Sequence, residues 1–137
     1  MGNIGLAIAK RAHFGFGCNI LYHNRRRKPE KEKIVKAKFF PVLNEMIPAC
    51  DFLCVACPLT KSTKNIVDEA QFHLMKPSAI LCNISRGGTV NQKALYRALS
   101  QDKIFGAALD VTGLNDESTL NMLCIIIFRS GTSSKRS

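Results

Sequence analysis

Two kinds of hydrophobic pattern alternate along most of the chain. Between Asn3 and Phe14 the apolar residues recur every three or four positions, which predicts an amphipathic helix. Continuous apolar runs at 52–57 and 79–83 predict buried strands, the first of them covered on both faces. Similar signals predict helices at 41–47, 68–75 and 91–100, and strands at 19–22, 38–40 and 105–111. This alternation predicts an α/β fold, with a parallel sheet covered by helices on both faces.

Length and composition agree with a single globular domain. A chain of 137 residues has room for one domain of ordinary size. Its content of 46% hydrophobic and 22% charged residues is typical of a folded protein rather than a disordered one. No apolar run reaches the roughly 20 residues that a membrane span needs, and the N-terminus lacks the layout of a secretory signal. We therefore expect a soluble, cytoplasmic protein without membrane association.

The formal net charge of +10 comes mostly from one segment. Between Arg25 and Lys38 there are eight Lys and Arg residues against Glu30 and Glu32, so this segment carries 8 − 2 = +6. A basic run of this kind is most often a solvated face or loop. Nucleic-acid binding is the less favoured interpretation, because the segment has no interleaved aromatic residues and no recognition motif.

The six cysteines are Cys18, Cys50, Cys54, Cys57, Cys82 and Cys124. Four of them lie in or beside apolar runs, where a free cysteine behaves as a small buried hydrophobe. Cys54 and Cys57 have the spacing of a metal or redox pair, but no second pair of ligands completes a zinc site. A redox pair would also lie at a helix N-terminus rather than in a strand. We interpret these cysteines as core residues and expect no metal site.

Glycines open the first predicted helix. Gly2-Asn3-Ile4-Gly5 matches the second half of the G-x-G-x-x-G pattern, in which a pyrophosphate approaches the backbone and lies on the helix N-terminus. Two glycines at this spacing are a weak signal, since an ordinary helix start has the same pattern. The specific signal is the ordered set of motifs that follows: Phe16-Gly17, Leu21 to Arg25, Cys57 to Thr60 with Thr63, Met75-Lys76-Pro77, Asn83 to Gly88 and Ala108 to Val111.

This set of motifs resembles the D-2-hydroxyacid dehydrogenase family, and it is most similar to the glyoxylate/hydroxypyruvate reductases. The resemblance covers residues 1–112 and implies a partial NAD(P)-binding domain with a Rossmann-like, doubly wound parallel sheet. It implies the activity of an oxidoreductase that reduces 2-oxo acids such as glyoxylate or hydroxypyruvate to D-2-hydroxy acids. In this interpretation residues 113–137 are a divergent C-terminal tail.

The resemblance also implies roles for individual residues. Arg86 matches the arginine that holds the carboxylate and 2-oxo group of the substrate, a task that suits a forked, permanently charged donor. The family's cofactor contacts match Gly2, Asn3, Ile4 and Gly5 at the pyrophosphate, Cys57, Pro58 and Thr63 on the adenosine side, and Ile84 and Asp110 at the nicotinamide amide. The structural alternatives are an ordinary turn arginine at Arg86 and a capping carboxylate at Asp110.

The choice of cofactor can be argued from charge. An NAD-dependent domain of this fold places Asp or Glu about 20 residues after the glycines, where it binds the ribose 2′-hydroxyl. Here the corresponding segment, 23–27, contains no carboxylate. A neutral residue followed by arginines suits a 2′-phosphate, so we expect NADP(H) to be preferred over NAD(H), with Asn24, Arg25 and Arg26 as its contacts. The alternative is that Arg27 and the lysines beyond it form only a solvated loop.

Some parts of the family's machinery have no match in the sequence. In the family a His supported by a Glu donates the proton. The Glu position reads Asn115 here, while His13, His23 and His73 lie in other motifs. The family's first strand would precede Met1, and its substrate domain has no counterpart. Because that strand is central, we expect a sheet in two separate halves, in a chain that is unstable alone or recruits a partner.

Two functions remain open on the sequence alone. One is the NAD(P)-binding portion of a 2-oxo-acid reductase that is inactive by itself. The other is a non-catalytic interaction protein, a pseudoenzyme that pairs with a full-length dehydrogenase. Since this family dimerises through its nucleotide-binding domain, the helix Ile4 to Phe14 is the expected contact in a homodimer or heterodimer.

Overall fold

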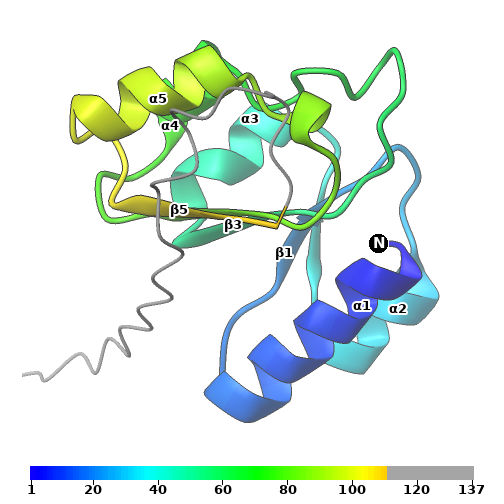
Figure 1. The fold of residues 1–137 in the computed structure, drawn as a ribbon. Coiled ribbons are helices and arrows are strands. Elements are labelled where there is room, and N and C mark those ends of the chain that lie inside the picture. The colour runs from blue at the N-terminus through cyan, green and yellow to red at the C-terminus, as the bar shows by residue number, and fades with distance from the viewer. Residues whose placement is uncertain (111–137) are drawn as a thin grey trace, which may run out of the picture.

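A computed structural model describes residues 1–110, in which short helices alternate with short strands (Figure 1). The elements are α1 (Asn3–Lys10), the π-helix η1 (Arg11–Gly15), β1 (Leu21–His23), α2 (Pro29–Val35), β2 (Lys38–Phe40), α3 (Leu43–Met46), the 3₁₀ helix η2 (Ile47–Ala49), β3 (Phe52–Val55), α4 (Glu69–Leu74), β4 (Ile80–Asn83), the 3₁₀ helix η3 (Gly87–Thr89), α5 (Gln92–Ser100) and β5 (Gly106–Leu109). Among these residues no helix is long and apolar enough to cross a membrane.

All strands pair in parallel, but they form two sheets. One contains β1 and β2, and the other has the order β3-β4-β5. The predicted parallel α/β arrangement is confirmed, and so is the expected division into two halves. In Figure 1, α3, α4 and α5 lie above the three-stranded sheet, while α1 and α2 lie side by side below it and to the right, next to β1. The helices therefore occupy opposite sides of the structure, as in a doubly wound fold.

The buried hydrophobic residues form two clusters, and Leu21 of β1 and Phe40 of β2 pack against the larger one. The larger cluster lies between the three-stranded sheet and α3, α4 and α5, and Leu81, Ile47 and Ala79 within it have no exposed surface. The smaller cluster joins α1, β1 and α2 and contains only four buried hydrophobic residues, Met1, Ala9, Tyr22 and Val35. Because free energy from burial scales with the apolar area removed from water, most of the stabilisation lies in the larger cluster.

The prediction that the strand at 52–57 is buried on both faces is wrong. Leu53 and Val55 are buried, but Phe52 and Cys54 are exposed on the other face of β3. On the next strand Ile80 and Cys82 are half-buried at the matching positions. Within the described residues, helices cover only one face of this sheet, so the apolar character of the run does not translate into two-sided burial. The interpretation of Cys54 as a core residue fails for the same reason, and Cys57 and Cys82 are only half-buried.

Helix α2 was not predicted, because its sequence is part of the basic run. Pro29 stands in the first turn, where its fixed φ suits a helix start, and Glu30 and Glu32 complement the helix dipole there. The helix ends at Val35, and the next residue, Lys36, caps it in a left-handed conformation with a φ of 50°. Val35 is its one fully buried apolar residue, and that is too little to give a periodic hydrophobic signal.

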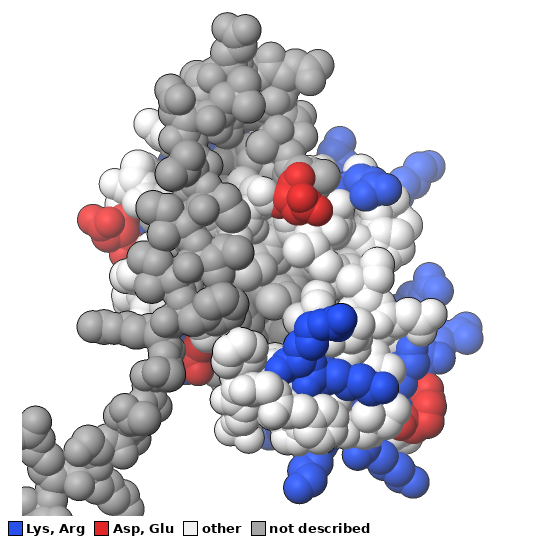
Figure 2. Space-filling view, turned by 60° about the horizontal axis from the view of Figure 1, so that its bottom comes forward, with Lys and Arg blue, Asp and Glu red and all other residues white. Residues whose placement is uncertain are grey.

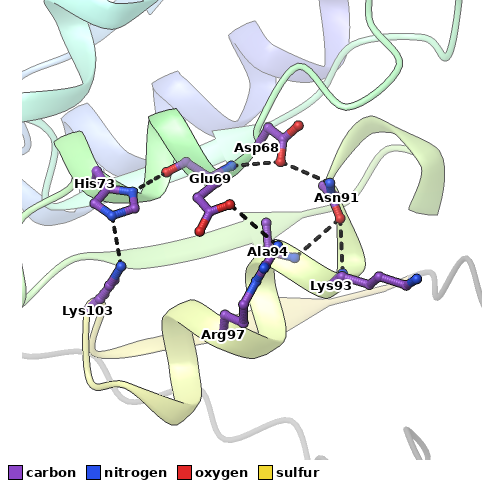
Figure 3. A network of polar contacts seen from close by, with 8 residues as sticks. All are labelled: Asp68, Glu69, His73, Asn91, Lys93, Ala94, Arg97 and Lys103. Atoms are coloured by element: carbon purple, nitrogen blue, oxygen red, sulfur yellow. Dashed lines mark hydrogen bonds and ion pairs between the residues drawn. The ribbon is translucent and has the colours of Figure 1, made fainter.

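The capped helices α4 and α5 are held together by polar contacts, which Figure 3 shows. Asp68 and Asn91 cap the two helices, and the Asn91 side-chain amide donates a hydrogen bond to Asp68 Oδ1 (2.9 Å). Farther along, Arg97 forms an ion pair with Glu69 (3.4 Å). These contacts fix the helices that cover the three-stranded sheet, and the caps explain why sequence patterns locate both helix starts correctly.

Candidate functional site

The predicted site residues follow the carboxyl ends of parallel strands. Val55 of β3 is in register with Asn83 of β4, which is in register with Leu109 of β5. The loops that follow these three positions carry Cys57 and Pro58, Ile84 and Arg86, and Asp110. Asn24 follows β1 in the same way. In open α/β sheets ligands bind outside this edge, so the topology brings these residues to the side where a site is expected.

A buried amide holds the turn after β4 in shape. Asn83 has no exposed surface; its Oδ1 accepts a hydrogen bond from the backbone N–H of Ser85 (3.0 Å), and its Nδ2 donates to the carbonyl of Arg86 (3.3 Å). Thr89, also fully buried, donates its hydroxyl proton to the same carbonyl (2.7 Å). The backbone of the turn is therefore fixed, while the side chains of Ile84 and Arg86 are exposed and available to a ligand.

Thr63 closes the loop that follows β3. Its hydroxyl donates a hydrogen bond to the carbonyl of Pro58 (2.6 Å) and accepts one from the backbone N–H of Thr60 (2.7 Å). One side chain thus joins both ends of the loop. The structure gives Thr63 a role in shaping this loop, and the expected contact with the adenosine side of a cofactor remains a prediction.

The loops after β3 and β4 are fastened to each other. The Ser85 hydroxyl donates a hydrogen bond to the carbonyl of Cys57, and burial raises the pKa of the Cys57 thiol. The N–H of Asn65 donates to the carbonyl of Gly88 (2.9 Å). A Cβ atom on Gly88 would lie 3.1 Å from a methyl group of Leu59, so a larger residue here would require the half-exposed Leu59 side chain to shift.

Asp110 lies directly beside this pair of loops. Its backbone N–H donates a hydrogen bond to the carbonyl of Asn83 (3.0 Å), which continues the β4–β5 ladder by one residue. Its carboxylate is exposed at the end of β5. The structure therefore brings together six predicted residues, which are Cys57, Pro58, Thr63, Ile84, Arg86 and Asp110.

The N-terminus of α1 forms a second group. Gly2 is the N-cap, with open space around it, and Asn3 and Ile4 in the first turn are exposed. Lys31 of α2 donates a hydrogen bond from Nζ to Oδ1 of Asn3 (3.1 Å). Burial and the nearby charges of Lys31 and Lys28 lower the pKa of the Met1 α-amino group. Lysines and the positive end of a helix dipole together favour an anion at this place.

Gly5 does not have the packing role that its motif suggests. A Cβ atom there would meet only the Met1 side chain, at 3.4 Å, which is an ordinary contact distance. No described strand approaches this position closely enough to require glycine.

A ring of hydrogen bonds organises the loop between β1 and α2. Tyr22 donates its hydroxyl proton to Glu32 Oε1 (2.6 Å) and accepts a hydrogen bond from the N–H of Lys28 (2.8 Å). Arg27 binds both oxygens of Glu32, with its Nη2 at 2.9 Å from Oε2. The hydrogen bonds from Arg27 and Tyr22 hold the pKa of Glu32 below its ordinary value, while burial and the bond to Glu32 raise the pKa of Tyr22.

The arginines of the basic run differ in their contacts: Arg27 takes part in this ring, and Arg25 and Arg26 do not. Arg27 lies in an exposed loop, as the alternative interpretation expects, and forms an ion pair with Glu32, whereas Lys31 and Lys33 beyond it lie in helix α2 rather than in a loop. Arg25 and Arg26 are exposed and, within residues 1–110, have neither an ion pair nor a hydrogen bond. Figure 2 shows more Lys and Arg than Asp and Glu on the coloured part of the surface that faces the viewer.

Sequence reasoning missed the residues that support the site. Tyr22, Glu32 and Lys31 were not singled out, and neither were Asn83 and Thr89. A carboxylate inside a basic run was the only signal for Glu32. For Asn83 the signal was a polar residue at the end of an apolar run, immediately before a glycine turn.

The three histidines of the chain belong to other elements than the Arg86 turn. His13 is in η1, His23 in β1 and His73 in α4, and each places Nδ1 on a backbone carbonyl, at 3.0, 3.0 and 2.7 Å respectively. The described residues also contain no group of three or more His, Cys, Asp or Glu side chains that could hold a metal ion.

Comparison with protein families gives a match over residues 1–123 to the D-isomer specific 2-hydroxyacid dehydrogenase, NAD binding domain. A glyoxylate reductase of Thermococcus gammatolerans is 51% identical over 110 residues, which are 80% of this chain and 32% of that protein. Glyoxylate/hydroxypyruvate reductase B of Pectobacterium carotovorum is 47% identical over 81% of this chain and 34% of its own. The chain thus spans about a third of the length of these relatives.

Similar solved structures belong to enzymes of the same kind. D-mandelate dehydrogenase of Rhodotorula graminis, in its apo form, superimposes with a TM-score of 0.83 and 32% identity, over 89% of this chain and 36% of that one. An NADPH-dependent glyoxylate/hydroxypyruvate reductase of Sinorhizobium meliloti, in complex with NADP and malonate, has a TM-score of 0.78 and 36% identity, over 88% of this chain and 37% of its own.

Proposed function

Because the chain belongs to the D-isomer specific 2-hydroxyacid dehydrogenases, through their NAD-binding domain, we propose that it is the dinucleotide-binding portion of a 2-oxo-acid reductase. The substrates we propose are glyoxylate or hydroxypyruvate, reduced to D-2-hydroxy acids, as the names of the similar reductases suggest. The observation that carries the proposal is the set of fastened loops at the carboxyl edge of β3, β4 and β5. This is the place where such sheets bind ligands.

The cofactor we propose is NADP(H) in preference to NAD(H). Arg25 and Arg26 are exposed and unpaired within the described residues, at the end of β1 where a ribose 2′-phosphate would lie. Glu32, whose charge would repel that phosphate, is neutralised by Arg27. The nearby N-terminus of α1 with Lys31 suits the pyrophosphate. The residues present therefore fit a phosphorylated dinucleotide at both of its anionic groups.

Arg86 is proposed to hold the carboxylate and 2-oxo group of the substrate. Its backbone is fixed by Asn83 and Thr89, while its exposed guanidinium can form the paired hydrogen bonds that a carboxylate accepts. The dinucleotide, when bound, supplies the hydride. The reaction also needs a proton donor, and none of the three histidines lies in the Arg86 turn. We therefore expect the 137-residue chain alone to bind the cofactor without turning over substrate.

The proposal is tested by following NADPH fluorescence while the purified 137-residue chain is added. We expect saturable binding that adenosine 2′,5′-bisphosphate displaces at lower concentration than 5′-AMP does, because only the first carries the 2′-phosphate. Absence of NADPH binding would overturn the dinucleotide site, and equal displacement by both nucleotides would overturn the preference for NADP(H). Steady NADPH oxidation with glyoxylate would overturn the expectation of inactivity.

Pairing with a second subunit is the other function that an observation favours. Ile4, Phe14 and Phe16 are 63%, 68% and 67% exposed on α1 and the turn after it, which is unusual for large apolar side chains. We propose that this surface pairs with another dehydrogenase subunit, in a homodimer or heterodimer. Sedimentation velocity of the chain, and of an Ile4→Glu/Phe14→Glu variant, tests it. We expect a dimer that the variant loses, and a monomeric parent chain over the micromolar range would contradict homodimerisation.

A further inference from the structure

Two cysteines lie opposite each other on the open face of the three-stranded sheet. Cys54 of β3 and Cys82 of β4 are partners in the parallel register. Side chains at paired positions point to the same face, and neighbouring strands are about 4.8 Å apart. Cys54 is exposed and Cys82 half-buried, so the pair lies on the face that no described helix covers.

The two thiols lie at paired positions on one face of the sheet, close enough to affect each other's ionisation. Hydrogen bonding with Cys54 lowers the pKa of the Cys82 thiol to about 7. The same interaction raises the pKa of Cys54. The thiolate is the reactive form of cysteine, so Cys82 is the nucleophile of the pair at neutral pH and Cys54 is the thiol poised beside it.

Other partners for Cys54 are excluded by geometry. Cys57 lies three positions farther along an extended segment, a span of roughly 10 Å, whereas a disulfide needs Cα atoms within about 7 Å. Cys50 is buried and its thiol donates to the carbonyl of Met46. Within the described residues only Cys82 is placed to react with Cys54.

We propose that Cys54 and Cys82 form a reversible dithiol–disulfide pair that a hydroperoxide oxidises. The Cys82 thiolate attacks the terminal oxygen of the hydroperoxide; the O–O bond breaks, Cys82 becomes a sulfenic acid, and the leaving alkoxide or hydroxide takes up a proton. The Cys54 sulfur then attacks the Cys82 sulfur, the S–O bond breaks, and water leaves with the Cys54 proton. Two thiols lose two electrons, and hydrogen peroxide is reduced to two water molecules.

The strand spacing is compatible with a disulfide at this position. A separation of about 4.8 Å between Cα atoms falls inside the range of disulfides, 4.4–6.8 Å, but below their usual 5.5–6 Å. We expect a disulfide at this short separation to be reduced by a small thiol such as glutathione, which regenerates the dithiol. Cys82 lies one residue before Asn83, so a disulfide between β3 and β4 would strain the two strands whose loops form the candidate site.

The proposal is tested by peptide mapping of the full chain after treatment with hydrogen peroxide. The protein is alkylated without reduction and digested with trypsin, which leaves Cys82 in the peptide 65–86 and Cys54 in the peptide 39–61. We expect these two peptides to be joined by a bond that dithiothreitol breaks, in protein that migrates as a monomer on a non-reducing gel. A link found only between two chains, or no link at all, would overturn the proposal.

Cys54→Ser and Cys82→Ser variants assign the link, and Cys57→Ser is the matched control in the same peptide. The link should disappear in the first two variants and persist in the third. In Cys54→Ser, dimedone should label Cys82 as a sulfenic acid, because the resolving thiol is gone. A link that persists in Cys54→Ser would show that Cys50 or Cys57 is the partner and would refute the assignment. If a variant fails to fold, peptide mapping of the parent chain still shows whether the two peptides become linked.

Discussion

The two sheets hold their loops by different means. In the three-stranded half, the loops rest on a large apolar core and on buried neutral groups, above all Asn83 and Thr89. In the two-stranded half, four buried hydrophobic residues support the structure, and an ionic ring around Glu32 shapes the loop. The three-stranded half thus presents a fixed loop backbone to a ligand, and the two-stranded half presents charged side chains.

This difference matches the two tasks of a dinucleotide site, which are to bind the features shared by NADH and NADPH and to distinguish the two cofactors. Features common to NADH and NADPH can be bound by fixed backbone groups and by single side chains such as Thr63 and Asp110. The 2′-phosphate that distinguishes them calls for charge, which surface residues such as Arg25 can supply without altering a core. The comparison makes separate predictions for the two halves.

The largest effect is expected from the core of the three-stranded half. Leu81 has no exposed surface at the centre of this sheet, so Leu81→Ala should lower the free energy of unfolding by about 2–5 kcal/mol. Val35→Ala, in the small cluster, removes two methyl groups and should cost about 2 kcal/mol. Urea denaturation measures both, with Tyr96→Ala at a 70% exposed position as the control. A larger loss for Val35→Ala than for Leu81→Ala would contradict the comparison.

A smaller loss is expected when the buried amide is removed. Asn83→Ala deprives the N–H of Ser85 of its acceptor in a buried turn, which should cost about 1–3 kcal/mol. The matched control is Asn44→Ala, because Asn44 is exposed and its side chain accepts a hydrogen bond from Gln71 at the surface (2.9 Å). The same urea measurement applies. Equal effects of the two substitutions would mean that Asn83 does not organise the turn.

The ionic ring should respond to pH, with a smaller effect. Since the folded-state pKa of Glu32 is depressed, its stabilising contribution is present above the unfolded value of about 4.3 and is lost as the pH falls through the folded value. The urea midpoint of the parent chain should therefore exceed that of Glu32→Gln near pH 7, and the gap should narrow below about pH 4.3. A gap that stays constant between pH 7 and pH 3 would show that the charge of Glu32 does not stabilise the fold.

The features of the fold that depend on residues close together in the chain can be predicted from the sequence. Helix α5 was located from its cap, Asn91, and helix α4 from its end at Lys76-Pro77. The alternation of strands and helices likewise predicted a parallel fold. The family motifs identified the loops at the sheet edge, and the structure brings six of their residues together.

The features that the sequence does not predict are those that depend on contacts between segments far apart in the chain. Burial of Phe52 requires an element over the second face of its sheet, and a hydrophobic run carries no information about that element. Helix α2 is stabilised through Glu32, whose partner Tyr22 lies on another element. The role of Asn83 could not be inferred either, because one polar residue in an apolar run breaks a pattern without showing what it binds.

The most direct test of the central claim is a parallel titration of NADPH and NADH into the parent chain, Arg25→Ala and Thr63→Ala. Arg25→Ala should weaken NADPH binding about tenfold, as expected for one charge-assisted hydrogen bond of roughly 1.5 kcal/mol, and leave NADH binding unchanged. Thr63→Ala should weaken both cofactors by the same factor, because it disturbs a loop that does not distinguish them. If Arg25→Ala weakens both cofactors equally, or if Thr63→Ala changes their ratio, the division of tasks between the two halves is wrong.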